Sequence, residues 1–248
     1  MIIISNLSKA FGPKRVLSGI NLKIYKGESL VILGPSGCGK SVLLKHIIGL
    51  LKPDEGQVLI DGEDITNFSQ MRLDALRMRM GMLFQSAALF DSLTVEENIA
   101  FGLRKHTNLS NLAIHHIVSE KLEMVGLPGS NNLMPSELSG GMRKRVGLAR
   151  AIAMEPEIIL YDEPTTGLDP IMTSAIDELH LSLKKRLGVT SIVVTHDLGS
   201  AYRVCDRLAL HYGGKIVAIG TKEEIINSPD PVVQQFIRGE AKGPMTLL

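Results

Sequence analysis

The stretch GPSGCGKS, residues 34–41, constrains the fold of this chain more than any other feature. It follows the apolar run SLVIL and opens the helical run SVLLKHIIGL. Glycine, four residues and then Gly-Lys-Ser between a strand and a helix form the pattern of a phosphate-binding P-loop. Its glycines let successive backbone N–H groups converge on phosphate oxygens at a helix N-terminus. The loop therefore predicts a nucleotide site.

Each position of the loop is a candidate for nucleotide contact. We expect Lys40 to reach the β- and γ-phosphates and Ser41 to bind Mg²⁺. The predicted nucleotide-binding residues of this segment are Gly34, Pro35, Ser36, Gly37, Cys38, Gly39, Lys40, Ser41 and Val42.

Apolar runs that alternate with helical patterns predict an α/β fold with a mostly parallel sheet and flanking helices. Residues 29–33, 158–161 and 190–196 are expected as buried parallel strands. Ligands of such sheets bind at the carboxyl ends of the strands. The stretches GEDITNF and HYGGKIVAIG predict hairpins of a peripheral antiparallel sheet.

The middle of the chain differs, because TVEENIAFGLR and LAIHHIVSEKLEMVGL show helical spacing without a strand signal. We therefore expect one P-loop NTPase domain whose core and β subdomain comprise residues 1–86 and 157–238. A helical subdomain, residues 87–156, is inserted into this core. A short tail, residues 239–248, contains glycine and proline and is predicted to be loosely packed.

Composition excludes several classes of function. The 248 residues carry a formal net charge of +1, which gives no electrostatic reason to expect a nucleic-acid partner. The two cysteines are too few for a disulfide framework. No apolar run approaches the ~18 residues of a membrane span, and the opening MIIISNLSK lacks the features of a secretory signal. We expect a cytoplasmic protein that reaches a membrane only through another chain.

Two carboxylates follow the apolar run IILY, residues 158–161, which is expected to be buried. In this position beside a P-loop, Asp162 is expected to hold Mg²⁺ through a water, and Glu163 to polarise the water that attacks the γ-phosphorus. Gln85 follows MGMLF and His196 follows SIVVT, so both are predicted at strand ends. There Gln85 can contact Mg²⁺ and the attacking water, and His196 can hydrogen-bond the γ-phosphate. The predicted reaction is ATP hydrolysis.

A second glycine-containing helix start, ELSGGMRKR, lies far from the P-loop. Two glycines there cost conformational entropy without adding packing, so we expect some feature to require bare backbone at that point. With GPSGCGKS, Gln85, LSGGM, ILYDEP, TGLD and VVTHD in this order, the chain resembles the nucleotide-binding subunit of an ATP-binding cassette (ABC) transporter over essentially residues 1–238.

The resemblance implies a head-to-tail dimer in which each ATP lies between one copy's P-loop and its partner's LSGG segment. Ser139, Gly140 and Gly141 would then contact the partner's nucleotide, as an anion site at a helix N-terminus. It further implies that Asp169 crosses the interface and that Phe11 stacks on adenine. Met142 stands where the family commonly has Gln. The basic run 143–145 is interpreted as a solvated helix face.

Several stretches resemble the ATPase subunit of the Mce/Mla-type lipid transporters, among them MPSELSGGM and PDPVVQQFIRGEAKGP. That resemblance implies phospholipid transport with a separate permease, an Mce-domain lipid-binding protein and in some systems a STAS-domain protein. An importer subunit for an amino acid or metal chelate remains an alternative, since it keeps every site residue. A DNA-acting ATPase is a remote one, because no heptads separate the P-loop from LSGG.

Overall fold

Strand β3 (Ser29–Leu33), which leads into the P-loop, is buried along its whole length. Strands β6 (Met80–Leu83), β7 (Ile158–Asp162) and β8 (Thr190–Thr195) are equally buried. Strands with no exposed face are typical of parallel sheets that helices cover on both sides. β3 pairs in parallel with β9 (Arg207–Tyr212), and β6 pairs in parallel with β7. The predicted α/β fold with parallel strands is therefore confirmed.

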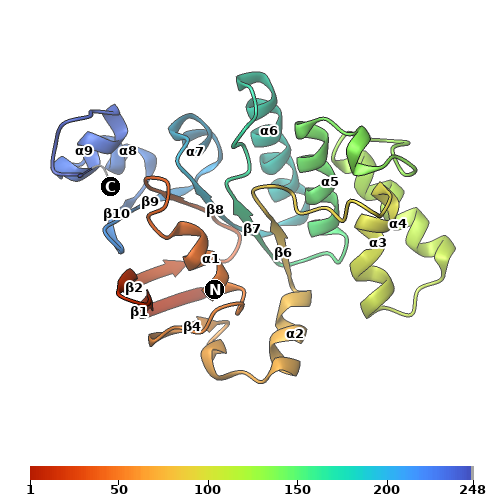
Figure 1. Cartoon of the computed structure of the whole chain (residues 1–248), viewed down its shortest axis with the longest axis horizontal. Helices are drawn as coiled ribbons and strands as arrows, with labels where there is room; N and C mark the ends of the chain where they lie inside the picture. Colours follow the sequence, from red (N-terminus) through yellow and green to blue (C-terminus); the bar gives the residue numbers. More distant parts are fainter. Residues whose placement is uncertain (247–248) are drawn as a thin grey trace. The chain divides into compact units, whose positions relative to one another are not determined.

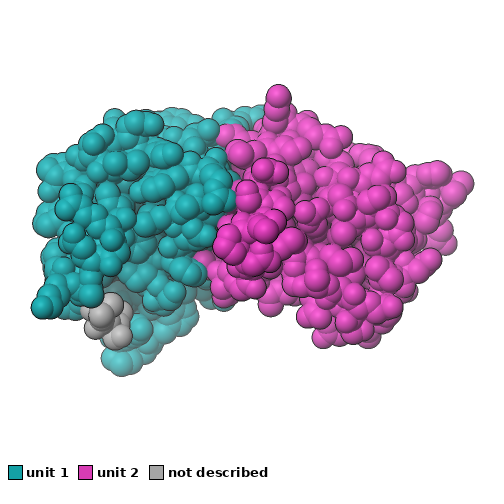
Figure 2. All heavy atoms as spheres, turned by 90° about the horizontal axis from the view of Figure 1, so that it is seen from above, with its two compact units in different colours: residues 1–73, 192–248 teal, residues 74–191 magenta. Residues whose placement is uncertain are grey.

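The computed structural model describes residues 1–246. Its contacts divide the chain into two compact units (Figure 2). Unit 1 comprises residues 1–73 and the chain from residue 192 onward, and unit 2 comprises residues 74–191. Among residues 1–246, no helix combines the length and apolar character needed to cross a bilayer.

Unit 1 contains a four-stranded antiparallel sheet in the order β2-β1-β4-β5. Ile2 at the start of β1 lies opposite Ile24 of β2 and Ile60 of β4, and all three side chains are buried. The bounds of its strands are Ile2–Phe11 for β1, Lys14–Ile24 for β2, Glu55–Ile60 for β4 and Glu63–Asp64 for β5. The unit's other elements are α1 (Lys40–Ile47), η1 (Ile65–Asn67), α7 (Leu198–Val204), β10 (Lys215–Gly220), α8 (Lys222–Ile226) and α9 (Pro231–Arg238).

The two predicted hairpins lie in different sheets. β5, within GEDITNF, pairs with β4 in the antiparallel sheet, as predicted. HYGGKIVAIG does form a hairpin, β9–β10, but β9 also pairs with β3, so its assignment to the peripheral antiparallel sheet is wrong. A Gly-Gly turn specifies the pairing of its own two strands and carries no information about the sheet that they join.

Unit 2 is mainly helical. Helices α3, α4 and α5 pack against one another, as Figure 1 shows. Their bounds are Val95–His106 for α3, Asn111–Met124 for α4 and Gly140–Ile152 for α5, and η2 (Pro135–Glu137) precedes α5. Helix α6 (Pro170–Leu187) follows β7 in the sequence. Helix α2 (Gln70–Met78) begins in unit 1 and ends in unit 2.

Helix α3 begins at a capping box. The Thr94 hydroxyl accepts a hydrogen bond from Glu97 N, and the Glu97 carboxylate accepts one from Thr94 N. One turn later, the buried Asn98 amide donates to three loop carbonyls and accepts from Phe90 N. The capping box and Asn98 therefore fix residues 90–94, the part of the loop that leads directly into α3.

The described part of the tail is attached through the buried Met245, so the prediction of a loose tail is wrong there, although its other residues up to 246 are exposed. Gln235 of α9 is 5% exposed, and its amide exchanges hydrogen bonds with the backbone of Met245 at 2.6 and 3.3 Å. Gln235 also donates to Glu240 O, and Thr246 N donates to the Tyr212 hydroxyl. A buried amide that pairs with peptide groups holds a segment that has little apolar surface of its own.

Candidate functional site

The P-loop closes around the ammonium of Lys40. This residue begins α1 and is 4% exposed, and its Nζ donates to Gly34 O at 2.8 Å and Pro35 O at 3.0 Å. A Cβ at Gly34 would lie 2.3 Å from the carbonyl oxygen of His211, so the backbone requires glycine there. The structure thus places a buried cation and bare backbone at a helix N-terminus, which suits phosphate groups.

Behind the loop, the imidazole of His211 contacts the Cys38 thiol. His211 lies in β9 and is fully buried, and its Nε2 has no hydrogen-bond partner among the described residues. Burial and the nearby charge of Lys40 lower the pKa of His211 to about 4. The ring is therefore neutral at pH 7 and adds no positive charge to the loop.

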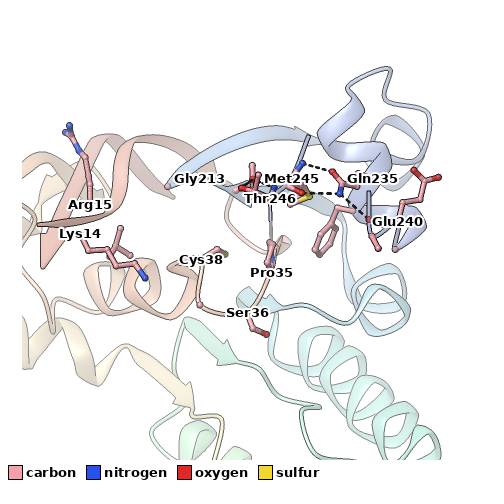
Figure 3. Close-up of a pocket in the computed structure, with 17 residues that line it drawn as sticks. Lys14, Arg15, Pro35, Ser36, Cys38, Gly213, Gln235, Glu240, Met245 and Thr246 are labelled. Carbon is pink, nitrogen blue, oxygen red and sulfur yellow. Dashed lines mark hydrogen bonds between the residues drawn. The ribbon is translucent and has the colours of Figure 1, made fainter. Parts of the chain in front are cut away.

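A cavity of about 800 Å³ adjoins the P-loop within unit 1 (Figure 3). Residues 35–38 line it together with the start of β2, the β9–β10 turn, α9 and the tail. Figure 3 shows Gln235 hydrogen-bonded to the tail at one side of this cavity and Lys14 and Arg15 at the other. Its volume lies in the range of small-molecule sites.

Two further residues predicted to contact nucleotide lie in unit 1. Phe11 ends β1 with 47% of its surface exposed, and the ammonium of Lys9 lies 5.8 Å from the centre of its ring. His196 directly follows β8 and is exposed. An exposed aromatic ring and an exposed strand-end imidazole are both accessible to a ligand.

In unit 2 the two predicted carboxylates lie at the end of β7. Asp162 is 8% exposed and Glu163 is 7% exposed. Glu163 has φ of 49°, a left-handed conformation that is strained for a residue with a side chain. The Thr166 hydroxyl donates to Glu163 Oε2 at 3.1 Å, and Thr166 N donates to Glu163 O at 3.3 Å. The backbone and the carboxylate of Glu163 are thus held in one arrangement, as expected of a functional residue.

Lys144 overturns the interpretation of residues 143–145 as a solvated helix face. Its side chain is 5% exposed, and its ammonium donates to the backbone carbonyls of Gln85 and Glu163. Burial lowers the pKa of Lys144, and the nearby carboxylates of Glu163 and Asp162 act in the opposite direction. Arg143 is exposed, while Arg145 donates to Val125 O at 3.0 Å.

Helix α5 begins at the LSGG segment. The Ser139 hydroxyl caps it by accepting a hydrogen bond from Met142 N at 3.2 Å. Gly140 is exposed, and the nearest atom to a Cβ built there would be a Leu168 methyl carbon at 3.7 Å. A Cβ at Gly141 would meet only the flexible end of the Met172 side chain. Among the described residues, no rigid group requires these glycines, which agrees with a ligand that approaches from outside.

Asp169 begins α6. Its exposed carboxylate accepts hydrogen bonds from Ile171 N and Met172 N, both at 2.9 Å. This N-cap is a sufficient local reason for an aspartate at this position. The predicted role of Asp169 at a dimer interface stays a prediction.

These features agree with what sequence comparison finds. A family model described as ABC transporter matches residues 17–166. The chain belongs to this family. Over 245 residues it is 46% identical to the intermembrane phospholipid transport system ATP-binding protein MlaF of Haemophilus influenzae, with 99% of this chain and 93% of that protein covered.

Two other relatives have a similar sequence identity to this chain. MlaF of Escherichia coli K12 is 44% identical, with 99% of this chain and 91% of that protein covered. A probable ribonucleotide transport ATP-binding protein, mkl, of Mycobacterium leprae is 44% identical over 98% of this chain and 70% of that protein.

Solved ABC cassettes share the fold. The dimeric, post-hydrolysis structure of the cassette MJ0796 with ADP and Pi has a TM-score of 0.82 and 34% identity, with 89% of this chain and 98% of that chain covered. CbiO1 from Clostridium perfringens has a TM-score of 0.84 and 32% identity, with 96% and 93% covered. The protein is therefore an ABC-type ATPase, and the predicted fold and enzyme class are confirmed.

The structural roles of three polar residues of this ABC ATPase, namely Lys144, Arg150 and His211, were not predicted from the sequence. For Lys144 a signal existed, because Leu148 and Ile152 follow it at steps of four on the buried face of α5. Arg150 donates to Ala88 O at 2.7 Å and Ala87 O at 2.6 Å, and nothing local in the sequence indicates those partners.

Proposed function

We propose that this ABC ATPase is the motor subunit of a transporter that moves phospholipids between membranes. The observation that carries the cargo is 44–46% identity to two MlaF proteins over nearly the whole length of both chains. The observation that carries the chemistry is the buried Lys40 in a P-loop of unit 1 and the fixed Glu163 of unit 2.

In the proposed mechanism, the P-loop N–H groups and Lys40 bind the phosphates of ATP, and Phe11 stacks on adenine. Glu163 is the general base for the attacking water, and His196 hydrogen-bonds the γ-phosphate. Support for the base comes from the 7% exposure of Glu163 and its contacts with Thr166, which orient the carboxylate before any substrate binds.

Mg²⁺ fits the side chains assigned to it. Ser41, Gln85 and Asp162 offer hydroxyl, amide and carboxylate oxygens, which are the ligands that this ion prefers. Bound beside ATP, Mg²⁺ would neutralise charge on the β- and γ-phosphates. These three residues would orient the ion. Asp162 would do so through a bound water.

The proposed active form is a head-to-tail pair of copies, each with Ser139, Gly140 and Gly141 at its partner's ATP. Support comes from the exposed Gly140 at a helix N-terminus and from the likeness to a cassette that was solved as a dimer. In such a pair, ATP binding joins the copies and hydrolysis releases them. Asp169 would lie near the interface and connect the two sites.

A separate permease would attach the motor to the cytoplasmic face of the inner membrane. Unit 2 has exposed aromatic side chains that suit a protein partner: Phe90 and Phe101 are 44% and 45% exposed, with ring centres 4.9 Å apart. An Mce-domain lipid-binding protein and a STAS-domain protein are further proposed partners. No nucleic-acid partner is proposed.

Two other cargos have some support. The likeness to mkl, whose name specifies ribonucleotide transport, makes ribonucleotides one of them, although that protein matches over less of its length. Small solutes such as amino acids or metal chelates are the other, because the motor residues would be the same.

Purification from gently solubilised native membranes, followed by mass spectrometry of co-purifying proteins and lipids, tests the cargo. A multi-pass permease with an Mce-domain protein and phospholipid is the expected result. A permease with a binding protein for a small solute or ribonucleotide would overturn the lipid assignment and leave the motor mechanism intact.

A further inference from the structure

The buried ammonium of Lys144 contacts the backbone at two residues that are expected to act on ATP. It donates to Gln85 O and, at 3.1 Å, to Glu163 O, and the three residues all belong to unit 2. A buried ammonium is costly unless hydrogen bonds and opposite charges compensate it. Methionine would fill the same volume without that cost, so packing alone does not account for a lysine at this position.

One of the two residues whose carbonyls accept from Lys144, the proposed general base Glu163, has a strained backbone. Glu163 lies in the left-handed region, with φ of 49°. Such a conformation persists only where surrounding contacts enforce it. The carbonyl of Glu163 accepts from Lys144 Nζ and from Thr166 N, so these two donors keep the peptide in its orientation.

A second cation on the same helix holds the segment that follows Gln85. Arg150 donates to the carbonyls of Ala87 and Ala88, whose φ values are 61° and 47°. The loop from residue 85 to residue 88 is therefore attached to α5 at three carbonyls. Lys144 differs from Arg150 in that it joins this loop to Glu163 as well.

We propose that Lys144 is a positioning residue for ATP hydrolysis, because it fixes the backbones of Gln85 and Glu163 relative to each other. Their side chains then meet the same nucleotide in one geometry. This inference rests on the proposed roles of Gln85 and Glu163. The proposal gives Lys144 of α5 a function at the ATP site of its own copy. The N-terminus of the same helix is proposed to act at the partner's ATP.

The test is the variant Lys144→Met, which keeps the aliphatic packing and removes the donors. Steady-state ATPase assays of the purified full chain should show kcat lowered about 10- to 100-fold, the loss expected when reacting groups are slightly misplaced. KM for ATP should change less than about threefold, because the P-loop contacts are unaltered. Lys144→Arg, which can donate to both carbonyls, should retain kcat within about fivefold of the wild type. Lys105→Met, a matched change of an exposed lysine in unit 2, should leave both constants unchanged.

Hydrogen exchange separates positioning from a loss of fold. Peptides that cover residues 83–90 and 163–168 should exchange faster in Lys144→Met, while the rest of unit 2 matches the wild type. Wild-type kcat in Lys144→Met would overturn the proposal. If Lys144→Met does not fold, Lys144→Arg decides, because a folded Arg variant with kcat lowered about 100-fold would also overturn it.

The variant Glu163→Gln is measured in parallel. Wild-type turnover of Glu163→Gln would refute the assignment of the general base, and with it the function proposed here for Lys144. An inactive Glu163→Gln beside a fully active Lys144→Met would refute the Lys144 proposal alone.

Discussion

The Cys38 thiol lies 3.1 Å from Nδ1 of His211, so a P-loop side chain contacts a buried ring of β9. The ring is neutral at pH 7 because burial lowers its pKa. The thiol therefore borders the phosphate site on one side and the core on the other. This contact leads to two predictions, one on chemical modification and one on acid stability.

Alkylation of Cys38 should abolish ATPase activity, because the adduct would occupy the loop that is expected to receive the phosphates. ATP present during the reaction should protect the enzyme. The measurement is residual ATPase activity against time with a maleimide, with the modified residue identified by mass spectrometry. Cys38→Ser should resist inactivation, whereas Cys205→Ser should behave like the wild type. Full activity with Cys38 demonstrably alkylated would contradict the prediction.

Acid should destabilise the fold through His211. Its pKa is about 4 in the folded chain against 6.5 for an ordinary histidine, so the unfolded chain binds the extra proton first. The contribution of His211 to stability is complete above about pH 6.5 and is lost as pH falls toward about 4. Between about pH 7.5 and about pH 5, the free energy of unfolding should fall by about 2 kcal/mol from this residue.

Urea unfolding of the wild type and of His211→Asn at the two pH values measures this effect. The variant should show a smaller fall, by about 2 kcal/mol, even if it is less stable overall. His116→Asn, a change of an exposed histidine, serves as the control. Equal falls for the wild type and His211→Asn would show that protonation of His211 does not drive the loss.

Glu163→Gln should keep ATP binding and lower turnover by about 10² to 10⁴, the range for loss of a general base. The amide keeps the shape of the side chain and cannot take a proton from water. Single-turnover ATP hydrolysis and nucleotide binding, measured on the same preparation, check this. Glu123→Gln, at an exposed position of α4, should leave turnover unchanged. Turnover unchanged in Glu163→Gln would mean that another group is the base.

Gln235→Leu should release the tail from α9. The change removes the hydrogen bonds from a buried amide to Glu240 and Met245, at a cost of about 1 to 3 kcal/mol. Limited proteolysis should then cleave near residue 240 faster than in the wild type. Gln234→Leu is the matched control, because the Gln234 amide donates to Ile226 O and Ser228 O and leaves the tail alone. Equal cleavage rates in the two variants would show that Gln235 does not hold the tail.

Local patterns predicted the parts of this fold that local physics determines. The P-loop and strand β3 follow from four consecutive apolar residues and a glycine pattern, and β8 from its apolar, β-branched centre, residues 192–194. The long antiparallel strands β1 and β2 were not predicted. Their pairing depends on register along two chain segments, which alternating polarity only weakly indicates.

The predictions for the β9–β10 hairpin and for the tail were wrong for a different reason. β9 joins β3 through pairing between residues 30–33 and 207–210, which lie far apart in the sequence. Gln235 holds the tail by hydrogen bonds to backbone groups, and any residue type supplies such groups. Neither contact leaves a trace in the local sequence pattern.

The residues of the candidate site likewise divide into those that local motifs predict and those that only the fold reveals. The motifs identified the P-loop, Asp162 and Glu163, whereas the basic run 143–145 was judged by charge alone. Helical phase would have placed Lys144 on the buried face of α5, but only the fold shows which carbonyls it meets.

The cations of α5 also have a consequence for the construction of chimeric ABC cassettes. Replacing α5 alone with the equivalent helix of a relative would leave the carbonyls of Gln85, Ala87 and Ala88 dependent on donors from a foreign helix. The smallest exchangeable module of this ATPase is therefore α5 together with residues 85–88 and 163–166. These three segments are separate in the sequence, so a graft of α5 from a relative has to include that relative's equivalents of both loops.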